Sequence, residues 1–377
     1  MKIGVLTFHN ADNCGAVLQA YAFTDALNAL PNCNAEIINY HNLRLENSYK
    51  PFNLLKSKNP IKFIGKIFLR SYFIFKRYNG FADFRRKHLK TSEKDYYFSN
   101  RSEILNDYDV IITGSDQVFN LNISGQDDTT YFLDISVKGA LCKKYTYAAS
   151  IGDLPTEKDE LKRFIDLLKN NFSYISFREK SSVDFLAENC SEIPCTSHLD
   201  PVFLLNGEAW RKISADKKIT RYVLYFNICK SESTSKAMRS AVDFAKANSL
   251  EPYYSSTTIF SREKGMRYLS CESPDVLLGS IKNADYVFTD SFHGAALCIL
   301  MHKNFFVETN IIRNSRVLDL LELTGLSHRG MKDGVISCDY VISEEEWAYA
   351  DAQIEKERQR AKDYLISIVK NKEDIDE

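Results

Sequence analysis

Four short polar clusters hold the side chains of this 377-residue chain that are best suited to chemistry. The first, residues 9–15, reads His-Asn-Ala-Asp-Asn-Cys-Gly and precedes an apolar helical stretch. Asp12 or Asn13 can cap that helix, and Gly15 lets a ligand approach the backbone N–H groups around Asn13, Cys14 and Gly15. The cluster therefore predicts an anion site at a helix N-terminus, and the competing interpretation is an ordinary capped loop.

The next two clusters each follow a run typical of a β-strand. Residues 113–117 include Ser115 and Asp116, and Asp116 is a candidate general base or an acceptor for a sugar hydroxyl. Residues 176–179 include Arg178, whose rigid planar fork suits a carboxylate or a phosphate. The competing interpretations are a helix cap for Asp116 and a surface ion pair of small energy for Arg178.

The fourth cluster, residues 289–294, reads Thr-Asp-Ser-Phe-His-Gly and leads into an apolar helix. Asp290 or Ser291 can cap this helix, and His293 falls in its first turn. A histidine in that place suits proton transfer near neutral pH, whereas the competing interpretation is a core histidine with satisfied hydrogen bonds. Together the four clusters describe a site for a small anionic substrate and a partner that carries hydroxyl groups.

Several signatures of other chemistry are absent from the sequence. No two glycines are separated by a single residue, which excludes the dinucleotide-binding fingerprint. The P-loop spacing from Gly325 to Gly330 is followed by Met331 instead of lysine, and D-x-D occurs at residues 374–376, near the end of the chain, and at residues 107–109, where a predicted strand begins. The nine cysteines show no zinc-ligand spacing and are expected to be buried thiols. We therefore expect a site that needs neither a metal nor a cofactor.

The elements that must position these clusters alternate along the chain. Short β-branched and aromatic runs are separated by helical patterns, which is typical of βαβ units with parallel sheets. Two such series predict an α/β fold of two Rossmann-like doubly wound domains that face each other across a cleft, as in GT-B-like proteins, with each cluster at the end of a strand. The predicted strands are Ile3–Phe8, Glu36–Tyr40, Asp109–Thr113, Tyr145–Ala149, Tyr174–Phe177, Arg221–Phe226, Pro252–Ser255, Tyr286–Thr289 and Asn304–Glu308.

The loop-rich stretch around residue 200 separates the two series. We therefore expect an N-terminal domain over residues 1–195 and a C-terminal domain over residues 196–343. Residues 344–377 form a terminal helix and tail, with Ser343 and Glu346 as a capping box. This helix is expected to pack across both domains through an apolar stripe. The stripe consists of Trp347, Ile354, Ala361, Leu365 and Ile368.

A strongly basic block, residues 50–90, interrupts the N-terminal domain as a helical insertion. It holds twelve Lys or Arg residues and one acid, Asp83, so its net charge is +11, and the rest of a chain whose total is -1 carries -12. Aromatic residues recur through the block at helical spacing. It is expected either to contact an anionic membrane surface or to pack on its own domain, with lysine stems covering apolar surface.

The overall composition, with 44% hydrophobic and 26% charged residues, is that of a globular protein. The balance of 49 basic against 50 acidic residues argues against a nucleic-acid binder. The first residues have too short an apolar run for a signal peptide, and no apolar run approaches the ~18 residues that span a bilayer. We therefore expect a cytoplasmic protein.

The ordered set of motifs resembles that of polysaccharide pyruvyl transferase family proteins. The resemblance covers roughly Met1 to Arg329 and implies a two-domain fold similar to that of GT-B glycosyltransferases. It also implies the transfer of pyruvate from phosphoenolpyruvate to two hydroxyls of a sugar, as a cyclic ketal, in the synthesis of capsular or other surface polysaccharides or of exopolysaccharide. The motifs that carry it are residues 3–20, 112–120, 147–152, 176–179, 198–201 and 289–294.

The resemblance also bears on the site. His293 and Arg178 match positions that family members use near phosphoenolpyruvate. Many relatives have Arg-Leu-His where this chain has Ser-Phe-His at residues 291–293, and Arg313 or Arg316 is the candidate substitute for the lost arginine. Phosphoenolpyruvate would be a donor substrate, so the resemblance implies no cofactor.

The reaction that the resemblance implies assigns further roles. His293 is the expected general acid or base, and Asp116 is expected to orient or deprotonate a sugar hydroxyl. Arg178, the amides around residues 13–15 and the side chains of Ser115 and Ser291 are expected to bind the substrate. The acceptor is a sugar or a lipid-linked oligosaccharide, and in the second case residues 50–90 would contact the inner face of the membrane.

Two other functions stay open. A GT-B-type glycosyltransferase that uses a nucleotide sugar would share the architecture and could place His293 and Arg178 on a diphosphate. A non-catalytic protein that binds carbohydrate or an anion is the other alternative, which the departure from the family pattern at Ser291 leaves open.

Overall fold

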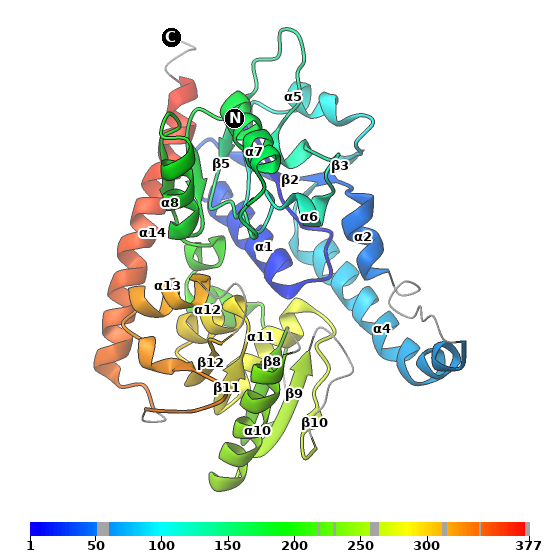
Figure 1. Ribbon diagram of the computed structural model, residues 1–377, viewed down its shortest axis with the longest axis vertical. Helices are drawn as coiled ribbons and strands as arrows, with labels where there is room; N and C mark the ends of the chain where they lie inside the picture. The colour runs from blue at the N-terminus through cyan, green and yellow to red at the C-terminus, as the bar shows by residue number, and fades with distance from the viewer. Residues whose placement is uncertain are drawn as a thin grey trace. The chain divides into compact units, whose positions relative to one another are not determined.

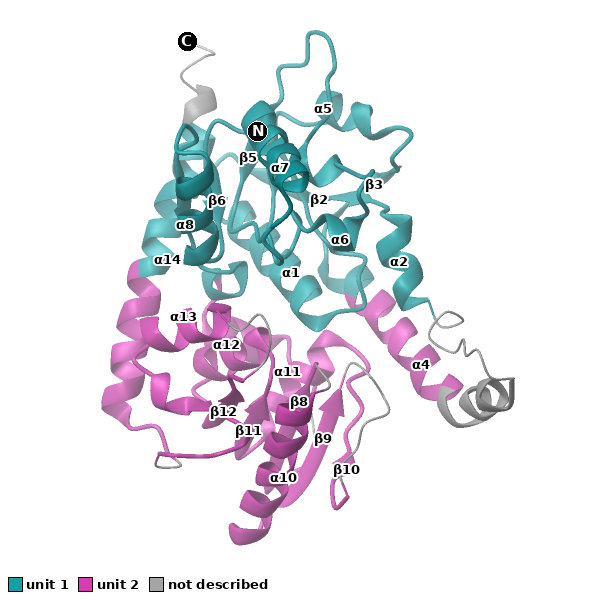
Figure 2. Ribbon diagram, in the orientation of Figure 1, with its two compact units in different colours: residues 1–53, 85–204, 357–377 teal, residues 54–84, 205–356 magenta. Residues whose placement is uncertain are grey.

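The chain divides into two compact units (Figure 2). Unit 1 comprises Met1–Asn53, Arg85–Leu204 and Glu357–Glu377, and unit 2 comprises Leu54–Phe84 and Leu205–Lys356. Each unit has its own parallel sheet, which confirms the expected α/β fold with two doubly wound sheets (Figure 1). The structure, a computed structural model, describes residues 1–50, 60–216, 219–228, 231–256, 264–310, 315–338 and 341–373.

Unit 1 is built on a five-stranded parallel sheet. Its strands are β1 (Lys2–Leu6), β2 (Asn34–Tyr40), β3 (Thr91–Tyr96), β4 (Val110–Thr113) and β5 (Lys143–Thr146), in the order β3-β2-β1-β4-β5. The strands β1 and β4 are almost entirely buried and aliphatic, as expected where helices cover both faces of a sheet. Isolated bridges of Ala149 to Asp116 and to Phe177 lead from this sheet to a further parallel pair, β6 (Ile175–Phe177) and β7 (Cys195–Ser197). The helices are α1 (Cys14–Asn28), α2 (Leu43–Tyr49), α5 (Ile104–Asp107), α6 (Leu121–Ser124), α7 (Lys158–Asn171) and α8 (Lys180–Asn189).

Unit 2 is built on a six-stranded parallel sheet. Its strands are β8 (Tyr222–Asn227), β9 (Glu251–Ser256), β10 (Arg267–Tyr268), β11 (Tyr286–Thr289), β12 (Phe305–Glu308) and β13 (Gly330–Met331). They lie in the order β10-β9-β8-β11-β12-β13, which is the strand order of Rossmann domains. The helices are α9 (Gly207–Lys212), α10 (Glu232–Ala247), α11 (Pro274–Asn283), α12 (Phe292–Leu300) and α13 (Ser315–Leu323). Two further helices, α4 (Pro60–His88) and α14 (Glu344–Glu373), contribute residues to both units.

Both sheets contain a topological switch point. From β1 in unit 1 and from β8 in unit 2, the chain first builds outward to one edge and then returns to the other side through β4 or β11. Ligands of open α/β sheets bind outside the carboxyl ends of the strands at such a point. The first and second polar clusters follow β1 and β4, and the fourth follows β11, so three of the four clusters flank a switch point.

All nine predicted strands are present, with ends shifted by a few residues at most. Four strands were not predicted, namely β3, β7, β10 and β13, and each lies at an edge of its sheet. An edge strand is paired on one side only, so it needs no continuous apolar run. The polar sequence of β3, Thr-Ser-Glu-Lys-Asp-Tyr, illustrates why the hydrophobic pattern did not reveal it.

The basic block forms the predicted helix, α4, but residues 54–84 group with unit 2 and not with the N-terminal domain. Two contacts explain the difference. The Lys76 ammonium lies 2.7 Å from the Glu272 carboxylate, and the backbone at Gly80 approaches the Glu272 carbonyl so closely that a Cβ would lie 2.4 Å from its oxygen. The described part of the helix buries Phe81 and Phe84, so these contacts and this apolar side attach it to its unit.

The terminal helix α14 belongs in part to each unit. It begins with the predicted capping box: Ser343 Oγ accepts from Glu346 N (3.2 Å), and the Glu346 carboxylate accepts from Ser343 N (2.8 Å). In unit 1, Arg358 Nε donates to Phe203 O (2.6 Å) and Tyr364 Oη donates to Thr146 O (2.9 Å). The predicted apolar stripe is confirmed, because all five of its residues are buried.

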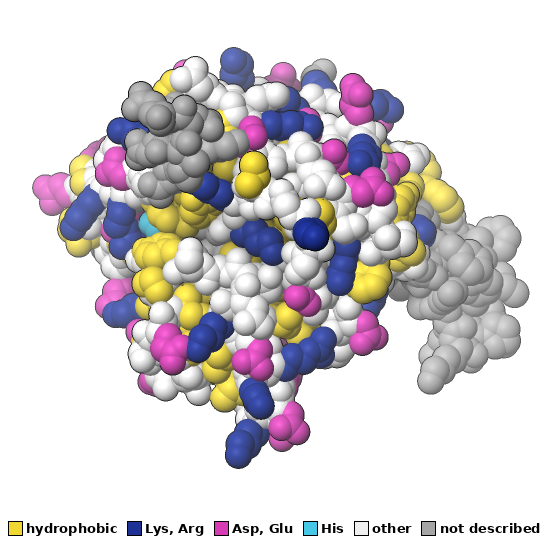
Figure 3. All heavy atoms as spheres, turned by 90° about the horizontal axis from the view of Figure 1, so that it is seen from above, with side chains coloured by type: hydrophobic (Ala, Val, Ile, Leu, Met, Phe, Trp, Pro, Cys, Tyr) yellow, Lys and Arg dark blue, Asp and Glu magenta, His cyan; other side chains and the backbone are white. Residues whose placement is uncertain are grey.

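The mixture of charges on the surface (Figure 3) agrees with the nearly equal numbers of basic and acidic residues. Basic and acidic side chains are interspersed over the face shown in Figure 3 and do not separate into patches of one sign. Among the described residues, no helix is both long and apolar enough to cross a membrane.

Candidate active site

The loop between β1 and α1 is held by its own side chains. Asn13 is the cap of α1, because its Oδ1 accepts from Gly15 N (2.9 Å) and Ala16 N (3.4 Å). Asp12 forms an ion pair with Arg85 instead, at 2.8 Å from Nη1. An anion at this helix end would therefore have to compete with Asn13 for the N–H of Gly15. The predicted anion site stays a prediction, and the predicted cap is confirmed.

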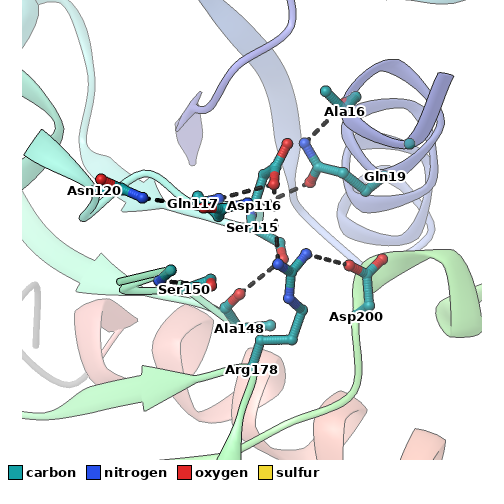
Figure 4. A network of polar contacts seen from close by, with 12 residues as sticks. Ala16, Gln19, Ser115, Asp116, Gln117, Asn120, Ala148, Ser150, Arg178 and Asp200 are labelled. Carbon is teal, nitrogen blue, oxygen red and sulfur yellow. Dashed lines mark hydrogen bonds and ion pairs between the residues drawn. The ribbon is translucent and has the colours of Figure 1, made fainter. Parts of the chain in front are cut away.

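A residue that the sequence did not single out, Gln19, connects the two loops at the switch point of unit 1. Its Nε2 donates to Thr7 Oγ1 (2.8 Å), and its Oε1 accepts from Ser115 N (3.2 Å). Thr7 Oγ1 in turn donates to Ser115 O (3.0 Å). Thr7, Gln19 and Ser115 are fully buried, so these bonds hold the β1 and β4 loops in a fixed relation; Figure 4 shows the bond of Gln19 to Ser115. A buried glutamine within the otherwise apolar start of α1 is the signal that could have identified it.

The β4 loop aims Asp116 out of the sheet while Ser115 points inward. Ser115 Oγ donates to Ala148 O (2.7 Å), so in this structure the hydroxyl bonds to the protein. Asp116 has φ +69° and accepts from Gln117 N (2.8 Å) through Oδ1. The turn needs Gly114, whose φ is +128° and whose added Cβ would lie 2.0 Å from the Tyr147 carbonyl oxygen. Asp116 keeps 15% of its side chain exposed, so the carboxylate of this cluster is partly accessible.

Arg178, at the end of β6, lies among three carboxylates, of which Figure 4 shows Asp116 and Asp200. Its guanidinium is 2.8 Å from Asp200, 3.1 Å from Glu179 and 3.9 Å from Asp116, and only 2% of its side chain is exposed. Burial alone would lower the pKa of Arg178, but the charges of Glu179, Asp200 and Asp116 outweigh it and hold that pKa above its ordinary value. The fork that the sequence predicted for a substrate anion thus contacts protein carboxylates, and one positive group faces three negative ones.

The segment after β7 contributes Asp200, one of the carboxylates that contact Arg178. Asp200 Oδ1 also accepts from Val202 N (3.1 Å), so both oxygens of its carboxylate are bonded. Two residues earlier, His198 Nδ1 lies 2.8 Å from Ser176 Oγ, and its ring stacks on those of Tyr147 and Tyr364 at centroid distances of 5.8 and 4.7 Å. The residues that surround Arg178 are therefore buried and hydrogen-bonded, and Arg178 in turn lies next to Asp116.

The corresponding loop of unit 2 carries His293. Of the two predicted caps of α12, the structure has Ser291, whose side chain accepts from Gly294 N (3.2 Å), and not Asp290. The Asp290 carboxylate instead accepts from Asn227 Nδ2 (2.9 Å) and Ile228 N (2.7 Å), and so ties the loops after β8 and β11 together at the switch point. His293 lies in the first turn of α12, half-buried.

The predicted site residues therefore fall into two sets. Unit 1 brings together Asp116 and Arg178, with Ser115 beside them and residues 13–15 across the same switch point. Unit 2 holds Ser291 and His293, and Arg316 lies partly buried at the start of α13. Arg313 lies outside the described residues. In the part of the chain that the structure describes, no group of three or more His, Cys, Asp or Glu side chains is placed to hold a metal ion.

Comparison with known proteins agrees with the fold and with the ordered motifs. A family model described as polysaccharide pyruvyl transferase matches residues 13–310. No curated protein matches the chain significantly.

Solved structures share the fold at low sequence identity. One is a protein from Listeria monocytogenes assigned as a UDP-N-acetylglucosamine 2-epimerase, with 8% identity and a TM-score of 0.50 over 97% of this chain and 90% of that one. Another is the UDP-GlcNAc 2-epimerase of Methanocaldococcus jannaschii in complex with UDP-GlcNAc and UDP, with 12% identity and a TM-score of 0.48 over 98% of this chain and 100% of that one. The first likeness supports a GT-B-type α/β fold and shows nothing about the substrate of this chain.

Proposed function

Because this chain belongs to the polysaccharide pyruvyl transferase family, we propose that it transfers pyruvate from phosphoenolpyruvate to two hydroxyls of one sugar. The product is a cyclic pyruvate ketal in a surface polysaccharide or exopolysaccharide. The observation that carries the proposal is the family match over residues 13–310, which includes Asn13, Asp116, Arg178 and His293. The same match does not favour the alternative of a glycosyltransferase that uses a nucleotide sugar.

The proposed reaction adds two oxygen–carbon bonds to C2 of phosphoenolpyruvate and breaks one. Protonation of the methylene carbon gives a methyl group and an electron-poor C2, which the first sugar hydroxyl attacks with loss of its proton. Phosphate then leaves with the electrons of its C–O bond, and the second hydroxyl attacks the same carbon and loses its proton. The two hydroxyl protons balance the one gained by carbon and the one carried away by phosphate.

His293 is the proposed proton donor to the methylene carbon. Its support is its place in the first turn of α12, beside the switch point of unit 2, with a half-buried side chain. The first-turn amides of that helix end would favour the negative groups of the donor. Ser291, as the cap of α12, is proposed to bind the donor near the same amides.

Asp116 is the proposed acceptor for a hydroxyl proton. Its carboxylate is partly exposed at the end of β4, and the guanidinium of Arg178 lies 3.9 Å from it. Because the guanidinium of Arg178 contacts Asp200 and Glu179 more closely, we assign it first to positioning Asp116. Direct contact of Arg178 with phosphoenolpyruvate would require a rearrangement of this cluster.

The test is phosphate release from phosphoenolpyruvate in the presence of galactose-, glucose- and mannose-type acceptors. His293→Ala should abolish the release that the wild type shows with its acceptor. The matched control is His302→Asn, because His302 lies just beyond the other end of the same helix, pairs with Asp351 and has φ +50°, which asparagine tolerates. Full turnover in His293→Ala would remove His293 from the chemistry, and phosphate release by the wild type would exclude a non-catalytic binding protein.

We also propose that a lipid-linked acceptor would be reached through α4. Its described part exposes the aromatic side chains of Tyr72, Phe75 and Tyr78, at 66, 50 and 37% of their full surface. These rings recur at three-residue steps within residues 50–90, whose net charge is +11, a combination that suits the interface of an anionic bilayer. Co-sedimentation with anionic vesicles at low salt is the test, with neutral vesicles as the control; absence of binding would contradict it.

A further inference from the structure

A pocket of about 610 Å³ in unit 1 is separate from the site described above. It is lined by residues 40–44 after β2, residues 97–99 after β3 and residues 124–128 after α6. In a parallel sheet these strand ends lie at the same edge as the ends of β1 and β4. The pocket therefore opens along the edge that carries the β1 and β4 loops, and its volume lies within the range of small-molecule sites.

Two aromatic rings form walls of this pocket while staying exposed. The Tyr97 ring stacks on His41, with centroids 5.0 Å apart and planes 18° apart, and is still 39% exposed. Phe98 is 50% exposed, and the guanidinium of Arg101 lies 4.1 Å from its ring centroid. His41 thus supports the ring of Tyr97, and Arg101 supports the ring of Phe98. The exposed part of each ring is open to a ligand. Such supported aromatic faces are rigid, so little side-chain entropy is lost when a ligand packs on them.

The polar groups of the pocket are fixed in a similar way. Asn42 Nδ2 donates to Asp128 Oδ2 and to Ser124 O, both at 2.8 Å, and Tyr40 Oη donates to Asp128 Oδ2 at 2.6 Å. The neighbouring carboxylate of Asp127 is exposed. The pocket therefore combines preorganised amide and hydroxyl groups with an accessible carboxylate.

The charges of the lining decide which class of ligand fits. The lining holds one arginine, Arg44, and two aspartates, Asp127 and Asp128, and Arg44 Nη2 already donates to Asn122 O (3.2 Å). A phosphate or nucleotide would meet no excess of positive charge here. A sugar ring is uncharged, packs its C–H face on an aromatic ring and donates its hydroxyls to carboxylates, so it matches each of these groups.

A chain of polar contacts connects this pocket with the β1 loop. His41 Nδ1 lies 2.8 Å from Glu46 Oε1, and Asn10 Nδ2 donates to the same oxygen (3.2 Å). Asn10 and His9 both contact Asn39 Oδ1, at 3.4 and 2.9 Å. The wall that holds Tyr97 is therefore continuous with the loop that leads to Asn13.

We infer that this pocket, named here the Tyr97–Phe98 pocket, binds a sugar ring of the acceptor. The inference rests on the proposed function for the identity of the ligand as the acceptor. The existence of a sugar site at Tyr97 and Phe98 rests on the pocket alone. Two measurements therefore test the sugar site and the proposed function separately.

The first readout is binding without phosphoenolpyruvate. Saturation-transfer NMR with the methyl glycosides of galactose, glucose and mannose should detect at least one ligand of the wild type. Tyr97→Ala and Phe98→Ala should each weaken that ligand about tenfold, as loss of a central aromatic contact does. Tyr349→Ala is the matched control, because Tyr349 is an aromatic residue of similar exposure, 52%, but belongs to unit 2. Equal binding by all variants would overturn the inference, as would failure of every glycoside to bind.

The second readout is phosphate release with the same acceptors. The KM for the acceptor should rise about tenfold in Tyr97→Ala and Phe98→Ala, while the KM for phosphoenolpyruvate stays unchanged. Normal acceptor KM values in both variants would overturn the pocket and leave the proposed function intact. Glycoside binding that is lost in Tyr97→Ala, without any phosphate release, would uphold the sugar site and contradict the proposed function. Binding of uridine monophosphate that Tyr97→Ala abolishes would overturn the inference in favour of a nucleotide site.

Discussion

His198 should make unit 1 sensitive to mild acid. Its ring is buried against Tyr147 and Tyr364, and burial, followed by the positive charge of Arg360, lowers the pKa of His198 to about 4. In the unfolded chain a histidine has a pKa of about 6.5. Between these values the unfolded chain binds a proton that the folded chain does not bind, so stability falls as the pH falls.

The magnitude follows from the two pKa values of His198, about 4 in the folded chain and about 6.5 in the unfolded chain. From pH 7.5 to pH 5.0 the free energy of unfolding should decrease by about 2 kcal/mol through this residue alone. Most of the decrease occurs below about pH 6.5, and the full effect of ~3.4 kcal/mol is reached only below about pH 4. His9 is also buried, and its pKa is lowered chiefly by burial, so the wild type carries a second contribution of the same sign.

Comparison with His198→Asn isolates the effect of His198. The amide oxygen of asparagine can occupy the place of Nδ1, which lies 2.8 Å from Ser176 Oγ, so the variant keeps an acceptor for that hydroxyl but cannot titrate. Urea unfolding at pH 7.5 and 5.0, followed by far-UV circular dichroism, measures both proteins. The two tryptophans, Trp210 and Trp347, lie in unit 2, so their fluorescence reports that unit separately.

The wild type should lose about 2 kcal/mol more than His198→Asn between the two pH values. The loss should be seen by circular dichroism in the transition of unit 1, which contains His198, Tyr147 and Tyr364. An equal pH dependence of the two proteins, within experimental error, would refute the reasoning, because it would mean that His198 titrates alike in the folded and unfolded chain.

Three further substitutions test the residues that position Asp116. Arg178→Met should lower the free energy of unfolding by about 3–5 kcal/mol, because three carboxylates lose their buried partner, and urea unfolding with a change below about 1 kcal/mol would show that the cluster is loosely held. Gly114→Ala should cost more than about 2 kcal/mol, since its Cβ would meet the Tyr147 carbonyl at φ +128°; a melting temperature equal to that of the wild type would contradict the turn. Gln19→Leu should cost about 1–3 kcal/mol by removing the bonds of Gln19 to Thr7 and Ser115, and hydrogen exchange should show the Ser115 amide less protected; unaltered protection would exclude that role for Gln19.

The elements and their caps could be predicted from the sequence because they depend on neighbours along the chain. Runs of apolar residues identified nine strands, and short polar residues marked the starts of α1 and α12. The local pattern narrowed each cap to two candidates. It could not choose between Asp12 and Asn13, because the partner that withdraws Asp12 is Arg85, far along the chain.

The environment of Arg178 could not be predicted from the sequence. Its local neighbour Glu179 was visible, but Asp116 and Asp200 come from loops more than twenty residues away on either side. The same limit applies to the Tyr97–Phe98 pocket, whose walls follow two strands and a short helix. Contacts of this kind depend on which strands become neighbours in the sheet, and hydrophobic periodicity carries no such information.

By itself, then, the sequence determined the α/β class, the strand ends at which polar clusters stand, and the ordered motifs that the family model matches over residues 13–310. Only the tertiary structure decided that Arg178 faces three carboxylates, that Gln19 fastens two loops, and that two exposed aromatic rings border one pocket. The physical reason is the distance along the chain over which each kind of interaction acts. Secondary structure follows from the spacing of apolar residues within a turn or a strand, whereas a charge or an aromatic ring acquires its chemistry from whatever the fold places beside it.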